Sequence, residues 1–326
     1  MLNIIRKSSF ILSLLAASTA LADSNCIDEL IKHGNENLTV KELRASCYSD
    51  TTNKQNESAL EQRIQFEQNL KQNPFALLPH RPNYFLPLAY NDVIKSELTN
   101  NVFGDAVDDV EFQFQLSVKA LLFDGLFNDK GKVWFAYTNR SFWQAYNGKI
   151  SSPFRETNHE PEILLSLHSE LELWGFRNRA NIFSFNHQSN GRTGSLSRSW
   201  NRIMLQSIWY KDNVAFHIRP WYRIPEDKDS YVGDPYGDDN PDIERFLGHF
   251  DFQGAYKYRD HTFSMMLRNN LRTSNNKGAI ELGWSIPFKP KVKGYVKYFK
   301  GYGDSLLDYN THIQSLALGL ELSGWF

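Results

Sequence analysis

Apolar and polar residues alternate along short segments from about residue 79 to the end of the chain. In residues 112–119 the even positions are apolar and the odd positions mostly polar, and the pattern recurs at 214–219, 280–286 and 315–326. Because successive side chains of a strand point to opposite faces, each segment predicts a β-strand with one apolar and one polar face. Such strands build either a soluble sandwich with a polar exterior or a membrane barrel with an apolar exterior.

Three features of these segments favour the membrane barrel over the sandwich. The segments are near ten residues long, Trp and Tyr gather near their ends, and the chain stops on a strand with the aromatic Phe326. At roughly 20 residues per strand and turn, residues 79–326 predict about twelve strands, an even number as antiparallel closure requires. The predicted fold is therefore all-β: a transmembrane antiparallel β-barrel of about 12 strands after a short polar extension.

The first residues have the layout of a secretory signal peptide. Residues 1–22 run from the basic Arg6 and Lys7 through an apolar stretch to a small-residue cleavage site that ends at Ala22. Residues 23–78 are polar and predict an extension with little core of its own. Beyond residue 22 no apolar run approaches the roughly 18 residues of a spanning helix. An exported chain of this kind is either soluble or an outer-membrane barrel.

Composition narrows the class further. The 326 residues carry a formal net charge of −1, with 41% hydrophobic and 22% charged residues, which excludes a disordered chain and an electrostatic nucleic-acid binder. Aromatic residues make up 14% of the chain although its mean hydropathy is only −0.49. A high aromatic content together with a polar mean hydropathy is typical of strands that alternate between an apolar and a polar face.

The two cysteines, Cys26 and Cys47, predict a disulfide, because an oxidising compartment can close the loop between them. The alternative is two free thiols. A metal site at these residues is disfavoured, since neither cysteine has a partner at C-x-x-C spacing.

Polar residues with catalytic chemistry gather on one predicted hairpin. His187 and Ser189 continue the apolar face of one strand, and Asn201 continues that of the next. A hairpin that is symmetric about Gly194 places His187 directly opposite Asn201. It also places Ser189 opposite Ser199, and directly opposed residues lie about 5 Å apart. All three polar side chains should therefore face the lipid and lie within reach of one another.

This trio predicts acyl-transfer chemistry. The imidazole of His187 can accept the Ser189 proton while Asn201 holds the other ring nitrogen, which is the nucleophile, base and orienter arrangement with a neutral amide as third member. The plainer interpretation is a set of polar residues near a barrel rim. It would have to explain three hydrogen-bonding side chains on the lipid face, where polar groups need partners, so we favour catalysis.

Several motifs spread over nearly the whole chain after residue 22 are specific. They are Asn73-Pro74-Phe75, Asn83-Tyr84, Ser151-Ser152-Pro153-Phe154-Arg155-Glu156-Thr157-Asn158, Asn186-His187-Gln188-Ser189-Asn190-Gly191-Arg192, Ser197-Arg198-Ser199-Trp200-Asn201-Arg202, Asp239-Asn240-Pro241-Asp242 and Gly301-Tyr302-Gly303-Asp304-Ser305-Leu306. With them the chain resembles the outer-membrane phospholipases A of Gram-negative bacteria. The resemblance implies a twelve-stranded, multi-pass barrel that hydrolyses acyl esters of glycerophospholipids (phospholipase A1/A2 and lysophospholipase type). It also implies a need for calcium and activity as a homodimer.

The resemblance assigns roles to residues of the hairpin. It implies that Ser189 is the nucleophile, His187 the general base and Asn201 the orienting residue. It also implies that the backbone N–H of Gly191 contacts the oxyanion.

The resemblance also implies a calcium site. Its ligands would be the Arg192 carbonyl, the Ser197 hydroxyl and the partner subunit's Ser151, which suit calcium as a hard ion that takes oxygen ligands. Because the loop at residues 190–199 has no carboxylate, Asp239 is the expected further ligand.

The segment 222–238 is longer than the family pattern leads us to expect. It holds four acidic residues: Glu226, Asp227, Asp229 and Asp234. The favoured interpretation is a solvated surface loop, and the alternative is a change in calcium affinity.

Other features of the sequence lead to plainer interpretations. A short lipase-like signature at residues 303–306 lies between strands and predicts a turn, while Lys119 and Arg219 predict charges of the barrel lumen. The sequence also leaves two rival functions. A passive outer-membrane pore or structural barrel explains everything except the hairpin at residues 186–202, and a soluble periplasmic esterase would not fractionate with membranes.

Overall fold

The structure, a computed structural model, describes residues 58, 60–61, 63–65, 76–92, 107–228, 230, 237–289 and 292–325. The chain divides into two compact units at Glu57/Ser58, and everything described here belongs to the second. The predicted signal peptide, nearly all of the predicted extension, the two cysteines and Phe326 lie outside the described residues. The proposed division of the chain into these segments therefore stays a prediction.

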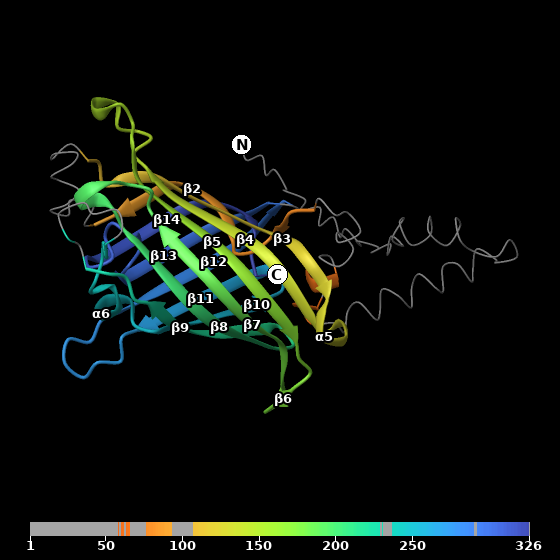
Figure 1. The fold of residues 1–326 in the computed structure, drawn as a ribbon. Helices are drawn as coiled ribbons and strands as arrows, with labels where there is room; N and C mark the ends of the chain where they lie inside the picture. Colours follow the sequence, from red (N-terminus) through yellow and green to blue (C-terminus); the bar gives the residue numbers. More distant parts are fainter. Residues whose placement is uncertain are drawn as a thin grey trace, which may run out of the picture. The chain divides into compact units, whose positions relative to one another are not determined.

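Twelve antiparallel strands in the described part of the chain form one closed ring (Figure 1). Each strand pairs with its neighbour in sequence, and β14 closes the ring by pairing with β2. The two-residue strands β1 (Leu78–Pro79) and β6 (Glu172–Leu173) pair with β3 and β7 outside the ring. The predicted twelve-stranded barrel is confirmed. The ring consists of β2 (Asn83–Asn91), β3 (Val110–Gly125), β4 (Gly131–Trp143), β5 (Phe154–His168), β7 (Phe176–Ser189), β8 (Ser199–Lys211), β9 (Val214–Ile224), β10 (Phe250–Tyr258), β11 (His261–Asn269), β12 (Gly278–Lys289), β13 (Val292–Tyr302) and β14 (His312–Ser323).

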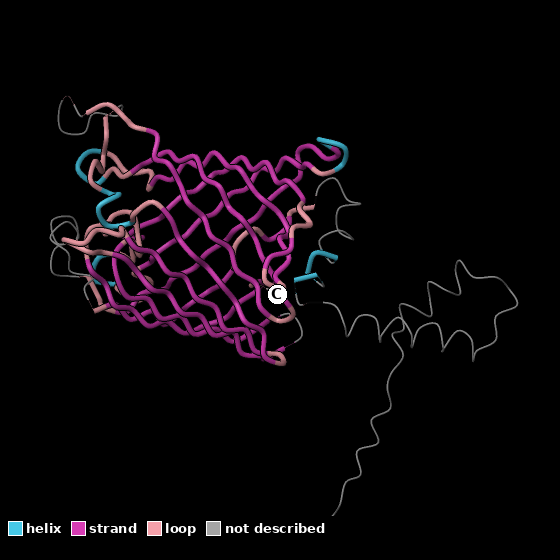
Figure 2. Tube along the Cα trace, turned by 90° about the horizontal axis from the view of Figure 1, so that it is seen from below, coloured by secondary structure: helices cyan, strands magenta, loops and turns pink. Residues whose placement is uncertain are grey.

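The wall of the barrel is apolar outside and polar inside. On β14 the side chains of Leu316, Leu318 and Leu320 are exposed, whereas Ser315 and Glu321, at positions of the opposite parity, are buried. The crossing strands of this wall are visible in Figure 2. A soluble sandwich has the reverse arrangement, so the exposed leucines show a surface made to face lipid. None of the described helices is both long and apolar enough to span a membrane.

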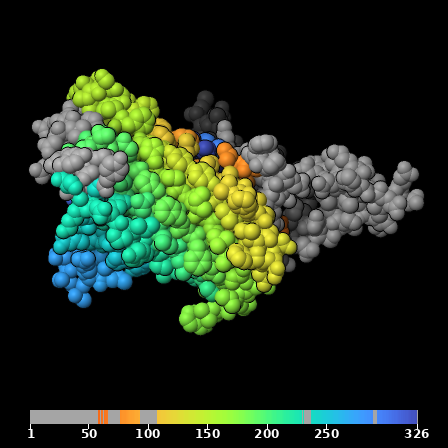
Figure 3. Space-filling model, in the orientation of Figure 1, coloured from red at the N-terminus to blue at the C-terminus, as the bar shows by residue number. Residues whose placement is uncertain are grey.

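The short helical segments and long connections lie at the two ends of the barrel. The 3₁₀ turns η2 (Gly148–Ile150) and η3 (Gly194–Leu196) and the helix α6 (Ile243–Leu247) lie between strands at the end where β7 stops and β8 begins. The turn α5 (Leu126–Asp129) and β6 lie at the other end. Figure 3 shows the β4–β5 turn and β6 protruding beyond the wall at opposite ends.

Buried ion pairs fill the lumen. The guanidinium of Arg155, 1% exposed, donates from Nε and Nη2 to both carboxylate oxygens of Glu111 at 3.0 Å and from Nη1 to Asp308 at 2.5 Å. Arg219 pairs with Asp251 at 2.6 Å, as expected for a lumen charge. A polar cavity of about 130 Å³ persists among these side chains. The interior is therefore packed and cross-linked by charge.

The predicted turn at residues 303–306 forms part of this packing. It connects β13 to β14 by bends and turns, and Asp304 is buried against Arg140. The interpretation of the lipase-like signature as a turn is therefore confirmed.

Replacing Arg155 should destabilise the barrel, because Arg155→Ala leaves the carboxylates of Glu111 and Asp308 buried without their cation. We expect the free energy of unfolding to fall by about 3–5 kcal/mol, measured by urea unfolding in detergent micelles. Arg177→Ala is the control, since Arg177 lies on the surface and approaches Glu61 only at 3.7 Å. Equal unfolding curves for the two variants would contradict the account of the lumen.

Candidate active site

The hairpin β7–β8 has the register that its sequence symmetry predicts. His187 lies opposite Asn201, and Ser189 lies opposite Ser199. The connection contains the 3₁₀ turn η3 and two residues in the left-handed region, Gly191 and Gly194, with φ near 63° and 64°. Glycine is favoured at both positions because a Cβ would be strained there.

The trio lies on the outer face of the barrel. Phe185 and Ile203, which precede His187 and follow Asn201 on the same faces of their strands, are 49% and 51% exposed. His187, Ser189 and Asn201 are themselves half-buried. The catalytic candidates therefore face the lipid side of the wall, near the end of the barrel that carries α6.

His187 and Asn201 are joined by a hydrogen bond. The distance between Nδ1 of His187 and Oδ1 of Asn201 is 2.9 Å. Because an amide oxygen can only accept, Nδ1 carries the proton, which leaves Nε2 of a neutral ring free to accept another. The hydroxyl of Ser189, two residues along the strand from His187, makes no hydrogen bond with any described residue.

The inner face of the same hairpin is fixed in the lumen. Asn186 and Arg202, opposite each other and next to the His187–Asn201 pair, point inward, and Arg202 Nε donates to Asn186 Oδ1 at 3.1 Å. Arg202 also donates to Glu160 on β5 at 3.0 Å. The fully buried Trp200 donates to Gln188 across the hairpin at 2.8 Å. These bonds hold the two strands at a fixed register and so position the outward side chains.

Asn190 organises the loop that follows Ser189. Its side-chain oxygen accepts the backbone N–H of Arg192 at 3.3 Å and that of Arg198 at 3.0 Å, and its amide nitrogen donates to the carbonyl of Leu196 at 2.9 Å. This one buried side chain thus spans the loop and shapes the backbone around Gly191.

His159 is a second imidazole beside the candidate nucleophile that the sequence reasoning missed. It lies on β5 directly opposite Ser189, and its Nδ1 is 2.6 Å from the hydroxyl of Tyr137. Its Nε2 edge faces Gly191, where a Cβ would come within 3.9 Å of it. The pairing of β5 with β7 brings His159 there, and no local motif in the sequence indicates it.

Two of the predicted calcium ligands come together. The hydroxyl of Ser197 donates to Oδ2 of Asp239 at 2.7 Å, and Ser199 donates to the same oxygen at 3.3 Å. Arg192 lies in the same loop, and its guanidinium donates to the carbonyl of Phe154 at 3.1 Å. Hydroxyl, carbonyl and carboxylate oxygens are the donors that calcium prefers, so these residues fit the ion.

Ser151, the remaining predicted ligand, makes no described contact with Ser197 or Asp239 within one chain. It follows η2 in the β4–β5 turn, with φ near 61°. Nor do the described residues contain a group of three or more His, Cys, Asp or Glu side chains that could hold a metal ion.

The acidic segment after β9 is not simply a solvated surface loop. Oε1 of Glu226 accepts a hydrogen bond from Nδ2 of Asn201 at 2.7 Å, and Glu226 is half-buried. The interpretation of a solvated loop is therefore wrong for Glu226, which folds back onto the hairpin, while Asp227 is exposed as expected. Asp229 and Asp234 lie outside the described residues. Burial raises the pKa of Glu226, opposed by the hydrogen bond from Asn201 and the charge of Arg223.

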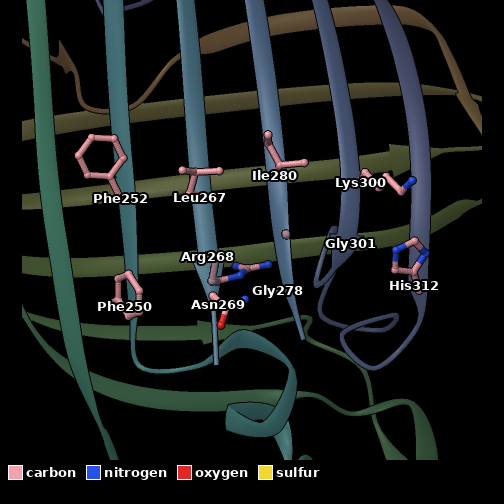
Figure 4. A pocket seen from close by; sticks show the side chains of 11 residues that line it. Phe250, Phe252, Leu267, Arg268, Asn269, Gly278, Ile280, Lys300, Gly301 and His312 are labelled. Carbon is pink, nitrogen blue, oxygen red and sulfur yellow. The ribbon is translucent and has the colours of Figure 1, made fainter. Parts of the chain in front are cut away.

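A separate hollow of about 530 Å³ lies on the wall of β10 to β14 (Figure 4). Phe250, Phe252, Leu267 and Ile280 line it, with Lys300 at one edge. None of the candidate catalytic residues belongs to it.

Comparison with known proteins decides the family. A family model described as "Phospholipase A1" matches residues 60–322. Phospholipase A1 of Klebsiella pneumoniae is 34% identical over 254 residues, covering 78% of this chain and 85% of that protein, and its Escherichia coli K12 counterpart is 33% identical with 78% and 84% coverage. The chain belongs to the phospholipase A1 family.

Solved structures agree with this assignment to the phospholipase A1 family. The Escherichia coli outer membrane phospholipase A superposes with a TM-score of 0.72 at 31% identity, covering 78% of this chain and 94% of the other. The outer membrane phospholipase dimer of Salmonella typhi, described with bound calcium, gives the same values. The resemblance noted in the sequence is confirmed, and the chain is an esterase-family enzyme and a multi-pass protein of the outer membrane.

Proposed function

We propose that the chain hydrolyses acyl ester bonds of glycerophospholipids with Ser189, His187 and Asn201, at a site open sideways to the bilayer. The observation that carries this proposal is the 2.9 Å hydrogen bond between His187 and Asn201 on the lipid-facing side of a hairpin that also presents Ser189. Membership of the phospholipase A1 family supports the substrate class.

The proposed reaction follows from these positions. Nε2 of His187 accepts the proton of Ser189 as its oxygen attacks the acyl carbonyl, and Asn201 accepts from Nδ1 and so stabilises the imidazolium. The backbone N–H of Gly191 donates to the developing oxyanion. His187 then protonates the departing alcohol, and water, activated by the same imidazole, releases the fatty acid from Ser189.

Calcium would be held by the Arg192 carbonyl, Ser197 and Asp239, together with the partner subunit's Ser151. When bound, it would supply positive charge beside the ester oxygen. The oxygen donors present support this assignment, as does the calcium described for the Salmonella typhi relative. Because no described contact joins Ser151 to Ser197 within one chain, we propose that a homodimer completes the site.

The packed lumen argues against the rival function of a passive pore. Salt bridges from Arg155 on β5 to Glu111 on β3 and to Asp308 in the β13–β14 turn cross the interior, and the cavity among the described side chains is only about 130 Å³. We therefore assign the activity to the outer face of the barrel wall, and to the lumen the role of holding that wall in place.

The nucleophile is tested by Ser189→Ala, with Ser195→Ala as the matched control on the same loop. We expect Ser189→Ala to lower phospholipid hydrolysis by about a thousandfold or more, because the variant lacks the proposed nucleophile and the Ser199 hydroxyl opposite it donates to Asp239. Ser195 is exposed, so its loss should leave the rate unchanged. Fatty acid release from phosphatidylcholine micelles measures both. Full activity of Ser189→Ala would refute the proposal.

The calcium assignment is tested by Asp239→Ala. Removing the carboxylate of the cluster should raise the calcium concentration needed for half-maximal activity by about tenfold or more, since ligand charge sets calcium affinity. Asp260→Ala, in the exposed β10–β11 turn at the other end of the barrel, is the control. An unaltered calcium dependence in Asp239→Ala would remove Asp239 from the site.

A further inference from the structure

The geometry points to Glu226 as a positioning residue that orients Asn201 and, through it, supplies negative charge to the imidazolium of His187. This inference rests on the proposed function, because it gives a further residue to the same site. It extends the Ser189, His187 and Asn201 arrangement by one carboxylate that lies two residues beyond the end of β9.

The backbone brings Glu226 to Asn201. Asn201 on β8 lies opposite Ile224, the last residue of β9, and Glu226 follows Ile224 by two residues, which continues the same face. The result is a chain of two hydrogen bonds: Glu226 Oε1 to Asn201 Nδ2 at 2.7 Å, and Asn201 Oδ1 to His187 Nδ1 at 2.9 Å.

The segment that follows β9 is itself anchored at its base. Asp227 forms an isolated parallel β-bridge with Gly237, and the carbonyl of Asp227 accepts the N–H of Asp238 at 2.8 Å. The guanidinium of Arg223 in turn donates to the carboxylate of Asp238 at 2.5 Å. Glu226 is therefore held in place by contacts on both sides of it in sequence.

A carboxylate at this place decides which way the amide of Asn201 points. The two ends of an amide differ, since the oxygen only accepts and the nitrogen only donates, and an ionised carboxylate only accepts. A flipped Asn201 would turn its oxygen toward Glu226 and its nitrogen toward His187. Glu226 therefore holds the oxygen toward His187, which keeps the proton on Nδ1 and Nε2 free for Ser189.

The charge of Glu226 has a second effect. A neutral amide stabilises an imidazolium less than a carboxylate does, because it carries no net charge. The carboxylate of Glu226 polarises the amide of Asn201 and so supplies part of the stabilisation of the imidazolium that a neutral amide alone does not give. Oε2 of Glu226 is buried and accepts no hydrogen bond from a described residue, so the carboxylate has Asn201 as its hydrogen-bond partner there. Burial raises the pKa of Glu226, which makes it a stronger acceptor.

The first experiment compares Glu226→Gln with Asp227→Asn, which removes the same charge from the exposed neighbour. With phosphatidylcholine micelles at saturating calcium, we expect Glu226→Gln to lower kcat by about tenfold with KM unchanged, the usual scale for one charge-assisted hydrogen bond. Asp227→Asn should keep the wild-type kcat. Equal kcat values for the two variants would overturn the proposal, as would a Glu226→Gln defect confined to KM.

A charge swap separates positioning from a purely structural role. Asn201→Asp alone places two carboxylates against each other and should lower kcat. Combined with Glu226→Gln, the carboxylate moves one step closer to His187 and the glutamine amide can donate to it, so kcat should rise above that of either single variant. A double variant no faster than the slower single variant would refute the relay, because a loss of folding alone predicts no rescue.

The outcomes also distinguish this inference from the proposed function. If Ser189→Ala stays active, the proposed catalytic site is wrong. If Ser189→Ala is inactive while Glu226→Gln matches Asp227→Asn, the site stands and only the role of Glu226 fails. Retained heat-modifiable migration on gels confirms that each variant is folded.

Discussion

The site depends on the hydrogen bonds that the guanidinium of Arg202 makes behind the hairpin. This guanidinium lies in the lumen and bonds to Asn186 on the adjacent strand and to Glu160 on the strand beyond. A barrel wall has no core of its own on the lipid side, so the position of an outward side chain is set from within. Arg202 therefore joins β8, β7 and β5 at the residue next to Asn201. These buried hydrogen bonds fix the positions of the side chains on the lipid-facing side.

Much of the fold could be predicted because it is determined by patterns within short segments of the chain. The period of two along each strand indicates which side chains face outward, and closure requires an even number of strands. The register of the hairpin was equally accessible, since symmetry about Gly194 fixes which residues oppose each other. His187 and Asn201 could therefore be paired from sequence, and they lie 2.9 Å apart through Nδ1 and Oδ1.

The remaining features depend on contacts between distant segments. His159 reaches Ser189 only through the β5–β7 pairing, and Glu226 reaches Asn201 from a segment whose acidic composition suggests simple solvation. The partners of the lumen charges cannot be read from the sequence, because alternation shows that Arg219 points inward but not that it meets Asp251. Periodicity gives the direction of a side chain, and only the three-dimensional arrangement gives its partner.

The loop braced by Asn190 has a consequence for any ion that arrives there. Three hydrogen bonds from this one amide fix the backbone from Arg192 to Arg198 within a single chain. Ordering a flexible loop around a cation would otherwise subtract conformational entropy from its affinity. Here that entropy is lost already when the barrel folds, so a modest set of oxygen donors would suffice for the proposed calcium ion, and its binding would leave the scaffold unchanged.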